Sequence, residues 1–383
     1  MMNNPSPKRQ VMFWQNIPSF HQSAHIRALA EMSEFEVTLV AQEELPKSFR
    51  DAGWTIPDFG KAKIVIITNH DAIDKLMADA GNDAIHIFSG IRFPMVRKAF
   101  HAAIKTKARI GLLSEAADWR GIRGFARFFL YTAEILRFGT KIDFVLAIGH
   151  LGVRWYSKCG VPAKKIYPYG YFVERSLNKP ENQSASDDFF RLAFVGQCIY
   201  RKGIDILLDA LATLKDFSWH LVVVGDGPEL TRLKQQALKL GVNIRVTFHG
   251  AKKNKETLEI IAAADLLVLP SRWDGWGAVV NEALMQGVPV VCSDKCGAAD
   301  LLQNPERGEV FKSGSVLGLQ KVLERRLKFG KRTPEITRRL IEWSRKIEGE
   351  TAAKYLIDIL KTSSGGGMRP VAPWFESTVG NKP

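Results

Sequence analysis

Residues Leu266–Leu284 read L-L-V-L-P-S-R-W-D-G-W-G-A-V-V-N-E-A-L, and this stretch decides the fold. A short apolar run ends at Pro270, a polar loop follows, and a helical pattern covers Ala278–Gln286, with Gly287 placed to end it. The apolar run is too short for a helix and is typical of a strand buried on both faces. A strand that leads through a loop into a helix is the repeating unit of a parallel α/β sheet.

The same unit recurs along the whole chain, with glycine or proline at most junctions. In the second half the expected strands are Arg191–Val195, His220–Val224, Arg245–His249, Leu266–Leu269 and Val288–Cys292, alternating with helices such as Ile204–Leu214, Glu229–Leu240 and Thr257–Ala264. In the first half they are Val11–Trp14, Glu36–Val40, Lys63–Thr68, Ala84–Phe88, Arg109–Leu113 and Asp143–Ile148, with helices that include His25–Met32 and Gly124–Leu136.

The length of 383 residues favours two domains, and the polar segment Ser176–Asp188 indicates a linker between them. We therefore expect two doubly wound parallel-sheet domains that face each other across a cleft. Ligands of such sheets bind at the carboxyl ends of the strands. The end of the chain, 363–383, opens with S-S-G-G-G and predicts a flexible tail, in which Pro373-Trp374 is a candidate for docking.

Composition narrows the class of partner. The hydrophobic fraction of 46% and the charged fraction of 25% are typical of a globular protein, and the net charge of +14 attracts anions. No run of like charges and no known motif indicates nucleic-acid binding. The four cysteines lack zinc or redox spacing, so we expect buried thiols in a reducing, cytoplasmic compartment. No apolar run is long enough to span a membrane.

Two glycine-containing loops follow the first two strands of the second half. Gly196 permits a tight turn, and Lys202 places a positive charge near a helix start, a good arrangement for a phosphate. A tight loop with a solvated lysine is the alternative. The loop that begins at Gly225 reads G-D-G-P, which is either a ligand contact or ordinary turn chemistry.

The opening stretch adds two acids, Asp274 in the loop and Glu282 on the helix. Free N–H groups near Gly277–Val279 would form an anion pocket between them, with each acid hydrogen-bonding sugar hydroxyls on one side of a diphosphate. Alternatively, Asp274 caps the helix and Glu282 is a solvated surface charge. That alternative leaves the packing of Trp273 and Trp276 around them unexplained.

From F-V-G-Q-C-I-Y-R-K-G to the G-V-P-V-V that ends at Val291, the order and spacing of these motifs resemble the retaining family 4 glycosyltransferases of GT-B fold. The resemblance implies a nucleotide-sugar donor as co-substrate, no metal and no other cofactor. It places Asp274 at the donor sugar, Glu282 at the ribose and Lys202 at the diphosphate. Gln197 stands where the family usually has arginine, with Arg201 as a candidate substitute, and Asp274 where it usually has glutamate. The implied donor-binding residues are Gly196, Gln197, Arg201, Lys202, Gly225, His249, Gly250, Asp274, Gly275, Trp276, Gly277, Ala278, Val279 and Glu282.

The first half, 1–178 with a closing helix at about 343–362, would bind the acceptor, and 190–342 would bind the donor. Polar residues after the first strand are the acceptor candidates: Gln15, Asn16, Ser19, His21 and Ser23. Glu115, with Asp118 behind it, follows the strand Arg109–Leu113 and would face the donor sugar. We expect Glu115 to act in catalysis together with Asp274, Lys202 and Glu282.

Residues 119–137 mix arginines with aromatic rings in a helical pattern. Such a helix suits an anionic membrane surface at the inner face of the cell membrane, and a core helix with charged shoulders is the alternative. We expect hexosyl transfer from a UDP-sugar, or from a GDP-sugar, to a glycan or lipid-linked acceptor in polysaccharide or glycoconjugate biosynthesis. A nucleotide-sugar epimerase and a non-catalytic assembly partner stay open as alternatives.

Overall fold

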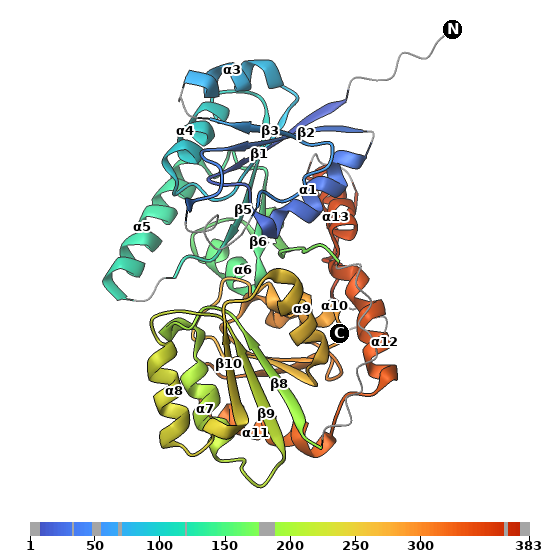
Figure 1. Cartoon of the computed structure of the whole chain (residues 1–383). Helices are drawn as coiled ribbons and strands as arrows, with labels where there is room; N and C mark the ends of the chain where they lie inside the picture. Colours follow the sequence, from blue (N-terminus) through green and yellow to red (C-terminus); the bar gives the residue numbers. More distant parts are fainter. Residues whose placement is uncertain are drawn as a thin grey trace, which may run out of the picture. The chain divides into compact units, whose positions relative to one another are not determined.

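The computed structural model describes residues 8–32, 34–47, 55–67, 71–118, 121–175, 188–363 and 367–375. The chain divides into two compact units (Figure 1). The first comprises Met1–Glu174 and Ile347–Pro373, and the second comprises Arg175–Lys346 and Trp374–Pro383. The sequence places the first division at 178 and the return of the chain at about 343. The expected linker, Ser176–Asp188, lies outside the described residues except for Asp188.

The first unit is a parallel sheet of seven strands in the order β3-β2-β1-β4-β5-β6-β7. The strands are β1 (Arg9–Gln15), β2 (Phe35–Ala41), β3 (Lys63–Ile66), β4 (Ile85–Phe88), β5 (Arg109–Glu115), β6 (Phe144–Ile148) and β7 (Ile166–Tyr169). Its helices are α1 (Phe20–Glu31), α3 (Asp71–Ala80), α4 (Pro94–Ala103), α5 (Gly121–Phe138), α6 (Gly149–Lys158) and α13 (Gly349–Thr362), with η1 (Ala163–Lys165) before β7.

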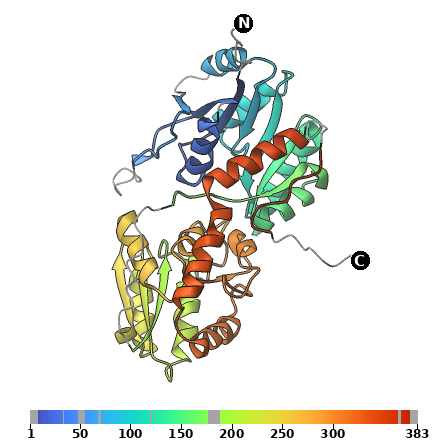
Figure 2. The same cartoon turned by 90° about the vertical axis from the view of Figure 1, so that its right-hand side faces the viewer.

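Helix α13 returns from the far end of the chain and packs beside α1 (Figure 2). The contact is close because Gly349 has no side chain: a Cβ there would lie 2.4 Å from the carbonyl oxygen of Ala24. The face of α13 that meets this unit is apolar and buried, including Leu356, Ile359 and Leu360. Burial of that face is what holds a distant part of the sequence in the first unit.

The second unit is a six-stranded parallel sheet in the order β10-β9-β8-β11-β12-β13, the doubly wound order of dinucleotide-binding folds. Its strands are β8 (Phe190–Val195), β9 (Trp219–Val224), β10 (Val246–Gly250), β11 (Leu266–Leu269), β12 (Val290–Ser293) and β13 (Gly308–Phe311). Helices α7 (Ile204–Ala212), α8 (Leu230–Lys239) and α11 (Val316–Phe329) gather on one face, and α9 (Asn254–Ala263), α10 (Val279–Met285) and α12 (Pro334–Trp343) on the other (Figure 1). Short 3-10 turns are η2 (Tyr200–Lys202), η3 (Asn243–Arg245), η4 (Gly297–Leu301) and η5 (Ser344–Ile347).

The predicted α/β class with two parallel sheets is confirmed. Strand β11 is fully buried, as its unbroken apolar run predicts. Two strands are absent from the sequence-based prediction. β7 carries a proline, which lowers its strand propensity, and β13 is interrupted by the acid Glu309. Helix α1 begins at Phe20, five residues before its predicted start, because its first turn is polar.

All four cysteines are free and buried, as predicted. Within the described part of the chain, no helix is both long and apolar enough to cross a bilayer. Within the expected tail, the predicted docking of Trp374 is confirmed: its side chain is fully buried and packs edge-on against Trp276 of the second unit, with 6.3 Å between ring centroids.

Candidate functional site

The sheet of the second unit changes winding direction between β8 and β11, and the loops after these two strands meet there. Gly203 makes the approach close. Its φ of +70° lies in the left-handed region, and a Cβ would lie 2.2 Å from the carbonyl oxygen of Pro270 at the end of β11. Only glycine fits, so this residue holds the 3-10 turn Tyr200–Lys202 against the loop that begins at Ser271.

Lys202 and Asp274 form an ion pair between these two loops. Lys202 Nζ lies 2.6 Å from Asp274 Oδ2, and the two side chains are only 14% and 11% exposed. Asp274 also accepts a long hydrogen bond of 3.4 Å from the Ser271 hydroxyl, and its Oδ1 lies 3.8 Å from Arg201 Nη1. Helix α10 has no side-chain cap. The alternative interpretation of Asp274 as a helix cap, and of Lys202 as a solvated side chain, is therefore wrong.

Arg272 adds further contacts between the loop after β11 and the segment after β8. Its guanidinium donates to both carboxylate oxygens of Asp205 at 2.8 and 2.7 Å and lies 3.9 Å above the centre of the Tyr200 ring. Its backbone N–H donates to the carbonyl of Arg201 at 2.8 Å, and Arg201 Nη1 donates back to the carbonyl of Trp273 at 2.8 Å. A two-pronged arginine–carboxylate pair is rigid, so it fixes the register of the two loops.

Glu282 lies in the first turn of α10, half-buried. Burial raises the pKa of its carboxyl from 4.5 to about 7. Among the described residues, no side chain or backbone group bonds or pairs with this carboxyl. Glu282 is thus not the solvated surface acid of the alternative interpretation. A half-buried acid whose oxygens have no protein partner is suited to accept hydroxyl groups of a ligand.

The glycine loops after β8 and β9 lie against each other. A Cβ on Gly225, whose φ is +138°, would lie 1.9 Å from the carbonyl oxygen of Gly196, so the two backbones touch. Gln197 is exposed beside them. On the other side, the Gly225 N–H donates to the carbonyl of Gly250 at 2.8 Å, which joins this loop to the exposed His249 at the end of β10. The predicted donor residues of β8, β9 and β10 therefore form one continuous edge.

Trp276, one of the implied donor-binding residues, has its ring in the core of the second unit. The residue is 1% exposed, its indole N–H donates to Asn281 Oδ1 at 2.8 Å, and Trp374 covers it. Gly275 and Gly277 are buried beside it, while Ala278 and Val279 are partly exposed where α10 begins. A tryptophan between two glycines fits both a binding loop and a packed turn, so the sequence context does not show where the ring lies.

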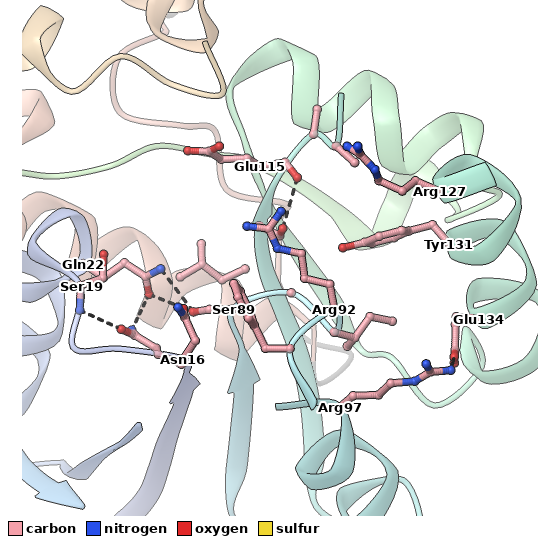
Figure 3. A pocket seen from close by; sticks show the side chains of 18 of the residues that line it. Asn16, Ser19, Gln22, Ser89, Arg92, Arg97, Glu115, Arg127, Tyr131 and Glu134 are labelled. Carbon is pink, nitrogen blue, oxygen red and sulfur yellow. Dashed lines mark hydrogen bonds and ion pairs between the residues drawn. The ribbon is translucent and has the colours of Figure 1, made fainter. Parts of the chain in front are cut away.

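The first unit has a cavity of about 450 Å³ at the corresponding place, where its sheet changes direction between β1 and β4 (Figure 3). Three predicted acceptor or catalytic residues, Asn16, Ser19 and Glu115, line it, and Gln15 does as well. His21 and Ser23 do not. The His21 ring stacks on Tyr171 with 4.9 Å between centroids, and the buried Ser23 hydroxyl donates to the carbonyl of Phe20 inside α1.

One wall of this cavity is a neutral network of amides and hydroxyls. Gln15 Nε2 donates to Gln22 Oε1 at 2.7 Å, and Gln22 Nε2 donates to Ser89 Oγ at 3.2 Å. The Ser19 backbone N–H completes the network by donating to Gln15 Oε1 at 3.1 Å. Ser89 is absent from the sequence-based prediction, although its place directly after β4 was a usable signal. Gln22 is absent because its spacing within α1 does not show which face it occupies.

The opposite wall is cationic and comes from segments distant in sequence. Arg92 precedes α4, Arg97 lies on α4, and Arg127, Tyr131 and Glu134 lie on α5 (Figure 3). Within the described ranges, no group of three or more His, Cys, Asp or Glu side chains is placed to hold a metal ion. The second unit offers a lysine held in place by an acid and the half-buried Glu282. The cavity of the first unit offers both hydroxyl-binding and anion-binding groups.

Part of the chain matches a known protein family. Residues 176–346 match the family described as glycosyl transferases group 1. A lipopolysaccharide glucosyltransferase, WaaG of Escherichia coli, is 37% identical over 154 residues, which are 38% of this chain and 40% of the relative. The alpha-D-kanosaminyltransferase of Streptomyces kanamyceticus is 24% identical over 225 residues, 56% of each chain. The chain thus spans about half the length of these curated relatives or less.

Solved structures extend the likeness in fold to most of the chain. The HepE protein of Anabaena, solved in complex with UDP, superposes with a TM-score of 0.71 at 17% identity, covering 92% of this chain and all of that one. At this identity the comparison shows the fold alone. Both parallel-sheet units therefore have the GT-B architecture.

Proposed function

We propose that this chain, whose residues 176–346 belong to the glycosyl transferases group 1 family, transfers a hexose from a nucleotide sugar to a glycan or lipid-linked acceptor. A UDP-sugar is the favoured donor and a GDP-sugar the second candidate. The transfer retains the anomeric configuration and uses side chains in place of a metal to stabilise the leaving diphosphate. The observation that carries the proposal is the Lys202–Asp274 pair at the winding change of the second sheet, with the unpartnered acid Glu282 nearby in sequence.

Each of these groups has a chemical task on a nucleotide sugar. Lys202 has three N–H donors and one carboxylate partner, so it retains donors for the diphosphate while Asp274 holds its ammonium group in place. Asp274 uses Oδ2 for Lys202, which leaves Oδ1 able to accept a hydroxyl of the donor sugar. Glu282, as a carboxylate, would accept both ribose hydroxyls.

The reaction breaks the bond between the anomeric carbon and the diphosphate oxygen, and forms one to the acceptor oxygen. Negative charge grows on the diphosphate as that bond lengthens, and the lysine positioned there lowers the barrier electrostatically. The acceptor hydroxyl transfers its proton to an oxygen of the leaving diphosphate. We name no protein nucleophile, and Glu115 is proposed to face the donor sugar from the first unit.

The relatives indicate the biological setting, because one is a lipopolysaccharide glucosyltransferase. We propose work on lipopolysaccharide or exopolysaccharide at the cytoplasmic face of the cell membrane. Helix α5 supports this placement because its large apolar side chains are exposed: Ile122 is 91%, Phe125 62%, Phe129 55% and Leu136 78% exposed. Arg127 and Arg137 on the same helix suit anionic lipid.

A thermal-shift screen with UDP-, GDP- and ADP-sugars tests the donor class, since a ligand that binds the folded state raises its melting temperature. We expect a UDP-sugar to raise it most. Lys202→Ala and Glu282→Gln should weaken the response by at least about tenfold in ligand concentration. The exposed residues Lys239 and Glu259 provide matched controls, Lys239→Ala and Glu259→Gln, which should respond like the parent chain.

Incubation of the donor alone, followed by analysis of the sugar, separates transfer from epimerisation. Conversion of the donor into its epimer without any acceptor would replace the transferase proposal with the epimerase one. A chain that no nucleotide sugar stabilises would contradict both. If biological activity survived Lys202→Ala, the non-catalytic interpretation would stand instead.

A further inference from the structure

The arginines of the first unit's cavity are not equivalent. Arg97 forms an ion pair with Glu134, whose side chain is 15% exposed, so its charge is compensated. Arg92 and Arg127 have no acidic partner among the described residues: Arg92 lies over the Phe93 ring, 4.8 Å from its centre, and Arg127 Nη1 donates to the carbonyl of Asp118 at 3.1 Å. Glu115 is a lining residue too. Two guanidinium groups therefore remain available to an anion.

Tyr131 adds a hydroxyl to this cationic wall. Burial raises the pKa of its phenol, and the charge of Arg92 acts in the opposite direction, which places the two groups near each other. The phenol stays protonated at neutral pH and can donate a hydrogen bond. Its oxygen lies 3.8 Å from the position that a Cβ on Gly90, another lining residue, would take. Figure 3 shows Arg92, Arg127 and Tyr131 grouped on the α5 side of the cavity.

The two walls divide the cavity by chemistry. The side formed by Gln15, Gln22 and Ser89 is neutral and suits the hydroxyls of a sugar. The side formed by Arg92, Arg127 and Tyr131 suits an oxyanion, because planar guanidinium groups bind phosphate through two parallel hydrogen bonds. A volume of about 450 Å³ accommodates one substituted sugar ring.

We infer that the acceptor bound in this cavity is a phosphorylated sugar or a sugar joined to a phosphate headgroup, with Arg92 and Arg127 as its phosphate-binding residues. This inference rests on the proposed glycosyl transfer and names its acceptor class. The phosphate can come from two sources, a soluble sugar phosphate or a lipid headgroup. Helix α5 presents Arg127 and Tyr131 to the cavity, and Phe125 and Phe129 to solvent, so the headgroup source would bring lipid alongside the exposed face.

Isothermal titration calorimetry on the full chain, with UDP saturating the donor site, tests the inference. The soluble probes are glucose 6-phosphate, glucuronate and glucose, and the lipid probes are phosphatidylcholine vesicles with and without phosphatidic acid. The test variant is Arg92→Ala/Arg127→Ala. The control Lys98→Ala/Lys105→Ala removes the same charge from exposed positions outside the cavity. Circular dichroism on each variant establishes that it is folded.

We expect glucose 6-phosphate, or the phosphatidic acid vesicles, to bind at least about tenfold more tightly than the neutral probe of the same kind. This tighter binding of the charged probe should vanish in Arg92→Ala/Arg127→Ala and persist in the control Lys98→Ala/Lys105→Ala. It should return in part with Arg92→Lys/Arg127→Lys. Whichever probe shows it identifies the source of the phosphate.

Equal binding of charged and neutral probes, or an advantage that survives Arg92→Ala/Arg127→Ala, would overturn the inference. Glucuronate bound as tightly as glucose 6-phosphate would also overturn the assignment to phosphate. Failure of the proposed function would give a different result. UDP would then show no heat of binding, whether or not the acceptor probes bind.

Discussion

Lys202 Nζ lies 2.6 Å from Asp274 Oδ2, and this contact joins the loop after β8 to the loop after β11 where the sheet changes direction. The pair is held by two neighbours. Gly203 allows the first loop to touch Pro270, and the Arg272–Asp205 pair fixes the second loop against it. An ion pair so little exposed keeps the lysine in place before any ligand arrives.

Replacement of Asp274 by asparagine should therefore lower kcat/KM for sugar transfer by about 100-fold, since it frees Lys202 to move and removes a hydroxyl acceptor. Asp274→Glu should retain more activity than Asp274→Asn because it preserves the charge. Steady-state kinetics measures both, and Asp216→Asn at an exposed turn is the control. Equal activity of the asparagine and parent chains would contradict the role of the pair.

Arg272→Lys should raise KM for the donor by about tenfold, with a smaller effect on kcat, because lysine cannot form the two-pronged contact to Asp205. Asp205→Asn should have a similar effect, and the double variant should be little worse than either single one. Arg232→Lys, which changes an exposed arginine on α8, is the control. Additive losses would show that the two residues act independently.

Glu282 should make donor binding depend on pH. The pKa of its carboxyl is raised to about 7, and the ionised form accepts hydroxyls, so donor affinity should increase as the pH rises through 7. Folding responds in the opposite direction: the folded state binds the proton more tightly, so stability from this group falls between about pH 4.5 and 7. Glu282→Gln should remove both trends, and Glu259→Gln should retain them. Titrations of donor affinity and of melting temperature against pH measure the two effects.

His25 should make the fold sensitive to acid. It is fully buried, neither ring nitrogen has a hydrogen-bond partner among the described residues, and burial lowers its pKa from 6.5 to about 3. The unfolded chain takes up this proton first, so stability is present above pH 6.5 and is lost as the pH falls toward 3. Chemical denaturation at pH 5 and pH 8 should show a smaller difference for His25→Leu than for the parent or for the exposed His249→Asn.

Helix α5 should bind anionic vesicles through its exposed rings. Phe125→Ser/Phe129→Ser should lower the vesicle-bound fraction at least about tenfold, because two large apolar groups no longer enter the lipid. Leu238→Ser removes a side chain that is also 65% exposed, but on α8, and should change nothing. Co-sedimentation with phosphatidylglycerol vesicles measures the fraction. Equal binding of the parent and the Phe125/Phe129 variant would leave α5 without this role.

The sequence by itself determined the architecture, because the signals for it are local. A buried strand, a Gly or Pro junction and an amphipathic helix each depend on neighbouring residues, and their alternation permits only a parallel sheet. The same locality placed Lys202 and Asp274 after strands, where ligands bind. It could not place β7 or β13, since a strand that contains proline or glutamate is fixed by pairing with its neighbour and not by its own propensity.

Only the tertiary structure decided which side chains meet. Strand order brings Lys202 within hydrogen-bond distance of a residue 72 positions away, and spacing along the chain contains no such information. Packing likewise sends Trp276 into the core against Trp374, though its sequence context is that of a binding loop. Arg92, just before α4, and Arg127, on α5, line one cavity although they are far apart in the sequence. Contacts of this kind depend on burial and strand order across the whole chain, which is why local patterns predicted the positions but not the partners.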